Sequence, residues 1–427
     1  MSPVKTYPEL QLKPGKELPV SYLHPWIFSG ALDENTKPKD LKSGSLVVVK
    51  DAPGNTLGVG TFSNHSMIAV RILDFTPPAE QTAATIDKKW FTNRFKAAAE
   101  KRKLLGYEES GTTAYRLIFG ESDGIPGLIV DRYGDALVIQ ISTEGIDNLK
   151  AEIIEALKVV FKPTLIVERS DIQSRHEEGL KEFKGVLYEK AATKSAEASS
   201  KKYASTNTVV PFQENGITFE TDLLEGQKTG FFLDQKDLRQ RLAKYAAKRN
   251  VLNVFSYSGA ASIYALKAKA SQTTNVDSSA EALAQAEKNA KLNKIPKTKY
   301  TNVEEDAFQF LGKFSAPDSK PEFDMTIIDP PALIKSNKDK EEGMKAYHFL
   351  NRAAIRATKD GGIFVTSSCS HYLTEDDLLL ILKKASIQSK VTLTILDHVT
   401  QAADHPLSMY FPEGAYLKSF ICLVSRK

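Results

Sequence analysis

The sequence predicts a multidomain α/β protein that ends in a doubly wound, mostly parallel sheet. In the first ~75 residues, about half of a typical domain, short apolar runs alternate with turn residues, which indicates a small strand-rich domain. Strand and helix patterns are then mixed up to residue 189, as in an α+β domain. After Val209, apolar strands alternate regularly with helical segments, the pattern of a parallel sheet covered on both faces.

Composition and charge restrict the class of protein. With 41% hydrophobic and 26% charged residues the chain is typical of globular domains, and a net charge of +4 is too small to indicate a nucleic-acid partner by itself. Its two cysteines, Cys369 and Cys422, exclude a disulfide framework and a four-cysteine zinc site, so we expect a reducing compartment and no metal. No apolar stretch reaches the roughly 18 residues of a membrane span, and the N-terminus lacks an apolar signal-peptide core. We therefore expect a cytoplasmic protein without a membrane partner.

The N-terminal domain is expected over residues 1–76. Residues 44–62 read as two strands joined by a Pro-Gly-Asn turn, and residues 66–75 alternate in polarity like a further strand. These short strands predict a small β domain.

The middle domain is expected over residues 77–189. Large apolar residues recur at helical spacing over 86–105, strand signals fill 115–142, and a helix at 146–160 precedes a strand at 164–169. The order of elements indicates a mixed α+β unit.

Residues 190–208 contain almost only Ala, Ser, Thr, Lys and other small or polar residues, which predicts a flexible linker. The last domain is expected over 209–427. Its strands are predicted at 251–255, 273–277, 298–303, 323–329, 362–367 and near 391–396, with a clear helix at 279–293.

The carboxyl ends of the strands form the ligand site of a doubly wound sheet. The first strand of this sheet leads into a turn of small residues, and Asp277 ends the next strand, where a carboxylate can accept both hydroxyls of a ribose. Asp306 follows the third strand, where it could reach an adenine amino group. Either aspartate alone could simply be a solvent-facing strand end. The expected cofactor contacts are Phe255, Ser256, Tyr257, Gly259, Asp277, Ser278, Asp306, Ala307 and Asp329.

Two cofactors fit such a site, a nicotinamide dinucleotide and S-adenosylmethionine (SAM). A dinucleotide site needs Gly-x-Gly-x-x-Gly so that the backbone can approach a pyrophosphate. The turn before Ala260 contains only Gly259 and does not match. SAM has no phosphate and tolerates a looser turn, so the sequence favours SAM.

Two further strand ends carry reactive side chains. The fourth strand ends in Asp329-Pro330-Pro331, a rigid corner that can present a carboxylate and a carbonyl to a planar base. The following strand ends in Ser-Cys-Ser-His around Cys369, outside its apolar run, whereas Cys422 lies inside the apolar strand SFICLV. Cys369 is therefore the candidate nucleophile, and Cys422 is expected in the core.

A nucleophilic cysteine indicates methylation of a ring carbon. Addition of a thiolate to carbon 6 of a pyrimidine makes carbon 5 a donor toward an electrophilic methyl group, whereas methylation of an exocyclic nitrogen needs no cysteine. Candidate RNA contacts are the basic segment 88–103 and, after residue 235, Lys236, Arg239 and Arg241. The alternative for each basic residue is a solvated helix face.

Long blocks of the chain, in the same order, resemble the RlmI family of class I SAM-dependent methyltransferases, which modify cytosine carbon 5 in 23S ribosomal RNA. The blocks that carry this resemblance are HPWIFSG (24–30), ESDGIPGL (121–128), ERSD (168–171), GQKTGFFLDQ (226–235), QAADHP (401–406) and PEGAYLK (412–418).

The resemblance implies an N-terminal PUA-like β-barrel that binds RNA, a small α+β middle domain, and a C-terminal Rossmann-like SAM methyltransferase domain. It also implies that Cys369 is the nucleophile, that Asp329 orients the cytosine, and that the partner is 23S rRNA or a large-subunit precursor. A nitrogen methyltransferase with a structural Cys369 and a non-catalytic ribosome-assembly factor stay as alternatives, and a homodimer stays open.

Overall fold

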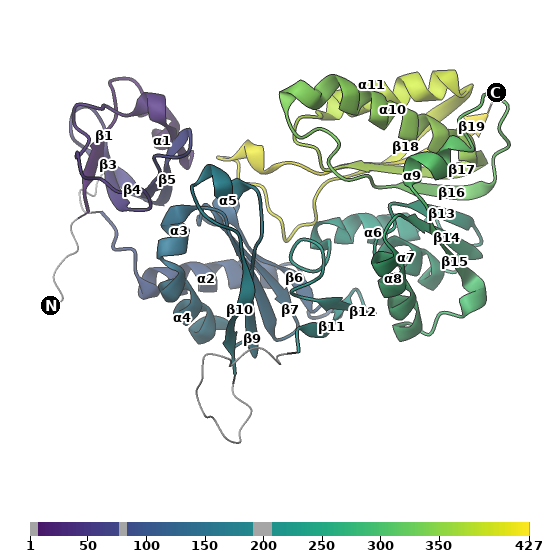
Figure 1. Ribbon diagram of the computed structural model, residues 1–427, viewed down its shortest axis with the longest axis horizontal. Helices are drawn as coiled ribbons and strands as arrows, with labels where there is room; N and C mark the ends of the chain where they lie inside the picture. Colours follow the sequence, from purple (N-terminus) through teal and green to yellow (C-terminus); the bar gives the residue numbers. More distant parts are fainter. Residues whose placement is uncertain (1–6, 77–82, 191–206, 427) are drawn as a thin grey trace. The chain divides into compact units, whose positions relative to one another are not determined.

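The computed structural model describes residues 7–76, 83–190 and 207–426 (Figure 1). The chain folds into two compact units that are each assembled from separate stretches of sequence. The first comprises Met1–Phe212, Thr221–Leu233 and Asp404–Gly414, and the second Gln213–Glu220, Asp234–Ala403 and Ala415–Lys427. Of the expected linker, residues 191–206 lie outside the described part, and the division into four segments stays a prediction.

A five-stranded sheet occupies the N-terminal part of the first unit. Its hairpin at 44–62 is the predicted one, and the carboxylate of Asp51 accepts the backbone N–H of Asn55 at 2.6 Å to close the turn. Apolar side chains such as Val47, Val49 and Val70 form its core. In spatial order the strands are β1 (Glu9–Gln11), β3 (Leu46–Lys50), β4 (Thr56–Phe62), β5 (Ile68–Phe75) and β2 (Trp26–Phe28), with a short helix α1 (Leu18–Ser21).

The second sheet of this unit is also five-stranded and carries helices. Its spatial order is β10 (Phe183–Glu189), β9 (Leu165–Ser170), β8 (Ala136–Ile141), β7 (Leu128–Tyr133) and β6 (Ala114–Phe119). Asp87 caps the helix α2 (Lys88–Lys103) by accepting the N–H of Trp90 at 2.9 Å. The helices are α2 (Lys88–Lys103), α3 (Glu144–Asn148), α4 (Lys150–Phe161) and α5 (Ser174–Glu177). The helix predicted at 146–160 is thus divided at Leu149, and the edge strand β10 was not predicted.

The buried side chain of Arg102 and the backbone N–H of Arg116 attach the returning chain segment to this sheet. Arg102 binds both oxygens of Asp123, at 3.0 and 2.6 Å, and also donates to the backbone carbonyl of Asp404 at 3.0 Å. The side chain of Asp404 accepts the backbone N–H of Arg116 at 2.9 Å. Charge-assisted bonds of this kind hold Asp404–Gly414 in the first unit.

The second unit contains the predicted doubly wound sheet. Strands β13 to β17 are parallel, and β19 is antiparallel to both of its neighbours. The spatial order is β15 (Tyr300–Glu304), β14 (Gln272–Asp277), β13 (Asn250–Val254), β16 (Phe323–Ile328), β17 (Thr358–Ser368), β19 (Lys418–Arg426) and β18 (Val391–Val399). The order of the chain reverses between β13 and β16, so the ligand crevice is expected at their carboxyl ends. A two-stranded sheet of β11 (Val209–Glu214) and β12 (Ile217–Asp222) precedes it in the chain.

Helices cover both faces of this sheet (Figure 1). Because successive side chains of a strand point to opposite faces, Phe364 of β17 packs in one core and its neighbours Ile363 and Val365 in the other. The helices are α6 (Lys236–Ala243), α7 (Ala260–Lys267), α8 (Ala280–Leu292), α9 (Ala307–Gly312), α10 (Lys340–Ala357) and α11 (Glu375–Gln388). In the described residues, no helix is long and apolar enough to cross a membrane.

Candidate cofactor and catalytic site

The turn between β13 and α7 has an unusual backbone. Phe255, Tyr257 and Gly259 have φ values of 59°, 46° and 71°. For residues other than glycine this conformation costs about 1–3 kcal/mol each and is concentrated at ligand-binding turns. At Gly259 a Cβ atom would come within 2.8 Å of the Cβ of Ala286, so the tight approach of α8 requires glycine. The expected cofactor turn is therefore a strained and closely packed one.

Asp277 is brought against this turn. One of its carboxylate oxygens accepts the N–H of Tyr257 at 2.8 Å, and the other accepts the N–H of Ser279 at 3.0 Å. Each carboxylate oxygen keeps a further lone pair for a ribose hydroxyl. Ser278 lies between Asp277 and Ser279, which caps α8.

Asp306 has a structural role that the sequence did not reveal. It is the N-cap of α9, and its Oδ1 accepts the N–H groups of Phe308 and Gln309 at 2.9 and 3.0 Å. Ala307 is the buried first residue of that helix. Both cap hydrogen bonds use Oδ1, which leaves Oδ2 for an adenine amino group. The contact of Asp306 with adenine therefore stays a prediction.

Asp329 follows β16 directly, and the side chain of Gln235 holds its carboxylate. Its Oδ2 accepts a hydrogen bond of 2.6 Å from the side-chain amide of Gln235. Pro330 is buried and Pro331 is exposed. The register pairs Ile328 of β16 with Thr366 of β17. Because the two strands are parallel neighbours, Asp329 and Cys369 follow strand ends on the same edge of the sheet.

The serines on either side of Cys369 fix its loop. Ser368 donates to the hydroxyl of Tyr347 at 2.9 Å, and the Ser370 and Tyr347 hydroxyls share a second bond of the same length. The backbone N–H of Ser370 also donates to the hydroxyl of Ser368 at 3.2 Å. Both serines are fully buried, whereas Cys369 is only partly buried. This arrangement anchors the loop on α10 and keeps the thiol out of the core.

The second cysteine has the opposite environment. Cys422 is fully buried within β19 among apolar side chains of the core. Burial raises the pKa of its thiol to about 12. The expectation that Cys422 is a core residue is confirmed.

Lys418 places a positive charge on the loop of Cys369. Its ammonium donates to the backbone carbonyls of Ser370 and Leu373, at 3.0 and 2.7 Å. Burial lowers the pKa of Lys418, and the charge of Cys369 acts in the opposite direction. Nearby cations favour the thiolate form of cysteine.

The structure corrects two of the expected RNA contacts. Lys236 and Arg239 are 1% and 3% exposed, so neither presents its charge to solvent. Arg239 binds both oxygens of the buried Glu214 at 2.7 Å, which explains why a basic residue is tolerated there. Arg241 is half-exposed and pairs with Asp397 at 3.2 Å. Of the three, only Arg241 stays a candidate for RNA.

The sequence reasoning did not single out Gln235, Tyr347 or Lys418. Gln235 and Lys418 lie in the blocks at 226–235 and 412–418 that carry the family resemblance. Membership of these blocks is the sequence signal that could have identified them. Tyr347 lies on the apolar face of a helix, where nothing in the sequence distinguishes it from a core tyrosine.

Two family models match the chain. An S-adenosylmethionine-dependent methyltransferase model covers residues 189–363, and a PUA-like domain model covers residues 10–75. The strained turn and the carboxylate of Asp277 fit the cofactor named in the first of them.

Curated relatives align with nearly the whole chain. Ribosomal RNA large subunit methyltransferase I of Aliivibrio fischeri is 35% identical over 97% of this chain and 99% of its own length. The proteins of the same name from Photobacterium profundum and Escherichia coli are 36% and 34% identical with the same coverage.

Solved structures share the fold over nearly the whole chain. SMU.776, described as a methyltransferase and crystallised with SAH, is 23% identical with a TM-score of 0.78, over 97% of this chain and 99% of its own. A structure from Streptococcus mutans, described as a SAM-dependent methyltransferase, is 22% identical with a TM-score of 0.77 and the same coverage. With relatives above 30% identity over nearly its full length, the chain belongs to the ribosomal RNA large subunit methyltransferase I family of SAM-dependent methyltransferases.

Proposed function

We propose that this protein methylates carbon 5 of a cytosine in 23S rRNA, or in a large-subunit precursor, through a covalent bond to Cys369. The relatives named ribosomal RNA large subunit methyltransferase I support the class of substrate. The observation that carries the carbon-5 assignment is the partly buried Cys369, fixed by two serines at a strand end on the edge that also carries Asp329. A purely structural cysteine would be expected inside the apolar run, as Cys422 is.

The cofactor is held by this chain's own strand ends. Asp277 is positioned to accept the ribose hydroxyls, and the turn at Phe255, Tyr257 and Gly259 lets the backbone approach the ligand closely. When bound, SAM supplies an electrophilic methyl group. Replacing Asp277 should therefore weaken cofactor binding and leave the thiol of Cys369 unchanged.

Cys369 and Asp329 activate the base. The partly exposed thiol of Cys369 gives its proton to solvent, and the thiolate Sγ bonds to carbon 6. The π electron pair of the 5,6 double bond moves toward carbon 5, which becomes nucleophilic. Asp329 orients the cytosine and assists protonation at N3. Once carbon 5 carries the methyl group, a base removes the proton from that carbon, the double bond re-forms and the Sγ–C6 bond breaks.

The covalent bond is the test. In RNA with 5-fluorocytosine at the target, carbon 5 has no proton to lose, so the adduct should persist through a denaturing gel. Cys369→Ala should lose both the adduct and methylation, and the matched control Cys422→Ala should keep both. Continued methylation of rRNA by Cys369→Ala would instead support nitrogen methylation. Absence of any methylation by the folded native protein would support the non-catalytic assembly factor.

A further inference from the structure

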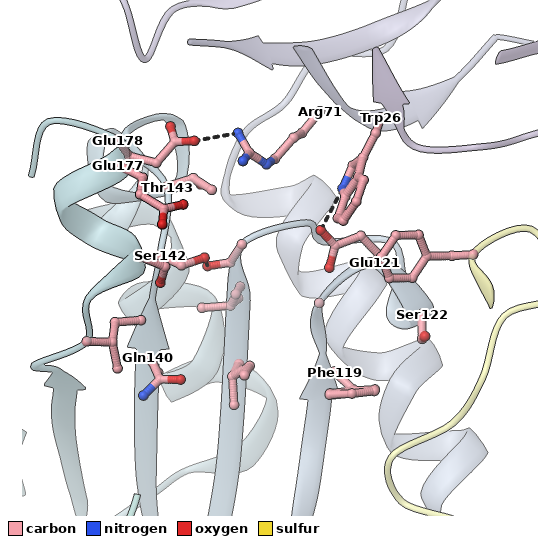
Figure 2. Close-up of a pocket in the computed structure, with 17 residues that line it drawn as sticks. Trp26, Arg71, Phe119, Glu121, Ser122, Gln140, Ser142, Thr143, Glu177 and Glu178 are labelled. Carbon is pink, nitrogen blue, oxygen red and sulfur yellow. Dashed lines mark hydrogen bonds and ion pairs between the residues drawn. The ribbon is translucent and has the colours of Figure 1, made fainter. Parts of the chain in front are cut away.

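The first unit contains a cavity that the methylation site does not use. Its volume is about 320 Å³, at the lower end of the range of roughly 300–1,000 Å³ for small-molecule sites. The first sheet contributes Trp26 and Arg71, and the second sheet and its loops contribute most of the rest. Figure 2 shows these side chains around one space. The cavity has room for one planar ring system.

Aromatic rings form one side of the cavity. The rings of Trp26 and Phe411 meet edge to face, with their centroids 4.7 Å apart. The indole N–H of Trp26 donates to Oε1 of Glu121 at 2.9 Å, which fixes the indole (Figure 2). Phe119 also lines the cavity. Such surfaces are suited to stacking on a flat base.

A buried hydroxyl on the opposite side lacks a protein partner. Thr143 is 3% exposed, and its Oγ1 makes no hydrogen bond within the described residues. Thr143 is the N-cap of α3, yet its side chain does not cap that helix. The Oγ of Ser122, beside Glu121, is also buried and makes no hydrogen bond within the part of the chain that the structure describes. Buried polar groups normally have partners. Because Thr143 and Ser122 both line the cavity, a ligand there could supply an acceptor for either hydroxyl.

The neighbouring Gly127 leaves the space that the Thr143 side chain occupies. Gly127 has a φ of +86°, and a Cβ atom there would lie 2.4 Å from the Oγ1 of Thr143. Any other residue would be strained and would crowd the hydroxyl.

The charges of the cavity exclude phosphate as its ligand. Arg71 and Glu178 form a buried ion pair with an N–O distance of 2.8 Å, so their charges cancel (Figure 2). Glu121 and Glu177 also line the cavity and leave it net negative. The ligand must therefore bring N–H donors to a carboxylate rather than a negative charge.

We propose that this cavity binds an unpaired guanine of the RNA substrate. The ring stacks on the aromatic side formed by Trp26 and Phe411, and its N1–H and 2-amino groups donate to the carboxylate of Glu121. The guanine O6 accepts from the hydroxyl of Thr143 or Ser122 once that side chain turns toward the cavity. Guanine alone among the four RNA bases offers two adjacent donors to one carboxylate together with an acceptor. The proposal rests on the proposed function, because that function supplies the RNA.

Trp26 provides the readout for binding. The chain has two tryptophans, so in a Trp90→Phe background the fluorescence reports on Trp26 alone. We expect the single-stranded pentanucleotide UUGUU to change this fluorescence saturably, and UUAUU and UUUUU to bind about tenfold more weakly or not at all. Glu121→Gln should weaken UUGUU binding about tenfold or more, since a charge-assisted pair is lost. The matched control Glu155→Gln, on a surface ion pair with Lys158, should bind as the parent does.

Thr143→Val keeps the shape of the side chain and provides a second variant should Glu121→Gln not fold. It should weaken UUGUU binding severalfold. Equal binding of UUUUU, binding of spermidine instead of UUGUU, or unchanged affinity of both variants would overturn the proposal. Methylation of 23S rRNA by the native protein is measured alongside. If methylation is present and UUGUU does not bind, only the guanine site fails, whereas absence of methylation with UUGUU bound is a failure of the proposed function.

Discussion

The ammonium of Lys418 and the backbone carbonyl of Ser370 are joined by a hydrogen bond of 3.0 Å, one residue beyond Cys369. A second bond of 2.7 Å reaches the carbonyl of Leu373. Burial lowers the pKa of this lysine, and the charge of Cys369 opposes that effect. The relationship gives Lys418 two separable roles, as an anchor of the loop and as a cation near the thiol.

Replacing Lys418 by Gln should slow formation of the 5-fluorocytosine adduct about tenfold or more, since about 1.4 kcal/mol of lost charge stabilisation corresponds to a factor of ten. The pH of half-maximal adduct formation should also move upward, because thiolates form less readily without a neighbouring cation. Gel-based rates between pH 6 and 9 measure both effects. Lys418→Arg should restore the profile, and Lys383→Gln, on the exposed side of α11, should not change it. A uniformly slower rate with no shift in pH would leave Lys418 only as an anchor.

Asp277→Ala should weaken SAM binding by roughly 1.5–3 kcal/mol, the contribution of hydrogen bonds to a charged group. The substitution also removes the acceptor of the Tyr257 and Ser279 N–H groups, so the strained turn should relax. Titration calorimetry measures the affinity, and circular dichroism checks the fold. Asp376→Ala, an exposed carboxylate at the start of α11, is the matched control. Native affinity in a folded Asp277→Ala protein would remove Asp277 from the cofactor site.

Much of the doubly wound sheet could be predicted because its strands are buried on both faces and read as apolar runs. The edge strand β10 could not, since Phe183–Glu189 is only partly buried and contains Lys184 and Gly185. The interruption between α3 and α4 at Leu149 was also hidden, because the apolar spacing continues across it. The pattern of apolar residues therefore predicts a strand or helix well only where burial is uniform along the element.

In the candidate site, too, some residues could be predicted from the sequence and others could not. Asp277, Asp329 and Cys369 could be chosen because their position after a strand is visible in the sequence. The burial of Arg239 could not be foreseen, because its partner Glu214 lies 25 residues away on β11. The side chains that position these groups depend on long-range contacts, such as that of Gln235 with Asp329 across 94 residues.

Thiol labelling should separate the two cysteines. At pH 8 iodoacetamide should modify the native chain at Cys369, whereas Cys422 should react only after denaturation. The pKa of Cys422 is raised to about 12, so its thiol stays protonated at that pH, and full burial also blocks access. Peptide mass spectrometry locates the label. Modification of Cys422 in the folded protein at a rate similar to that of Cys369 would contradict this assignment.

Arg239 and Arg241, two residues apart on α6, should respond to substitution in opposite ways. Arg239→Gln leaves the buried carboxylate of Glu214 without its bidentate partner, which should lower the free energy of unfolding by about 3–5 kcal/mol. Arg241→Gln breaks a half-exposed pair with Asp397 and should cost at most about 1 kcal/mol. Urea unfolding followed by circular dichroism measures both.

If Arg241 also contacts a phosphate, Arg241→Glu should reduce the slope of log K against log salt for rRNA binding by about one. A stable Arg239→Gln protein with a flattened salt slope would instead place Arg239 at the RNA surface.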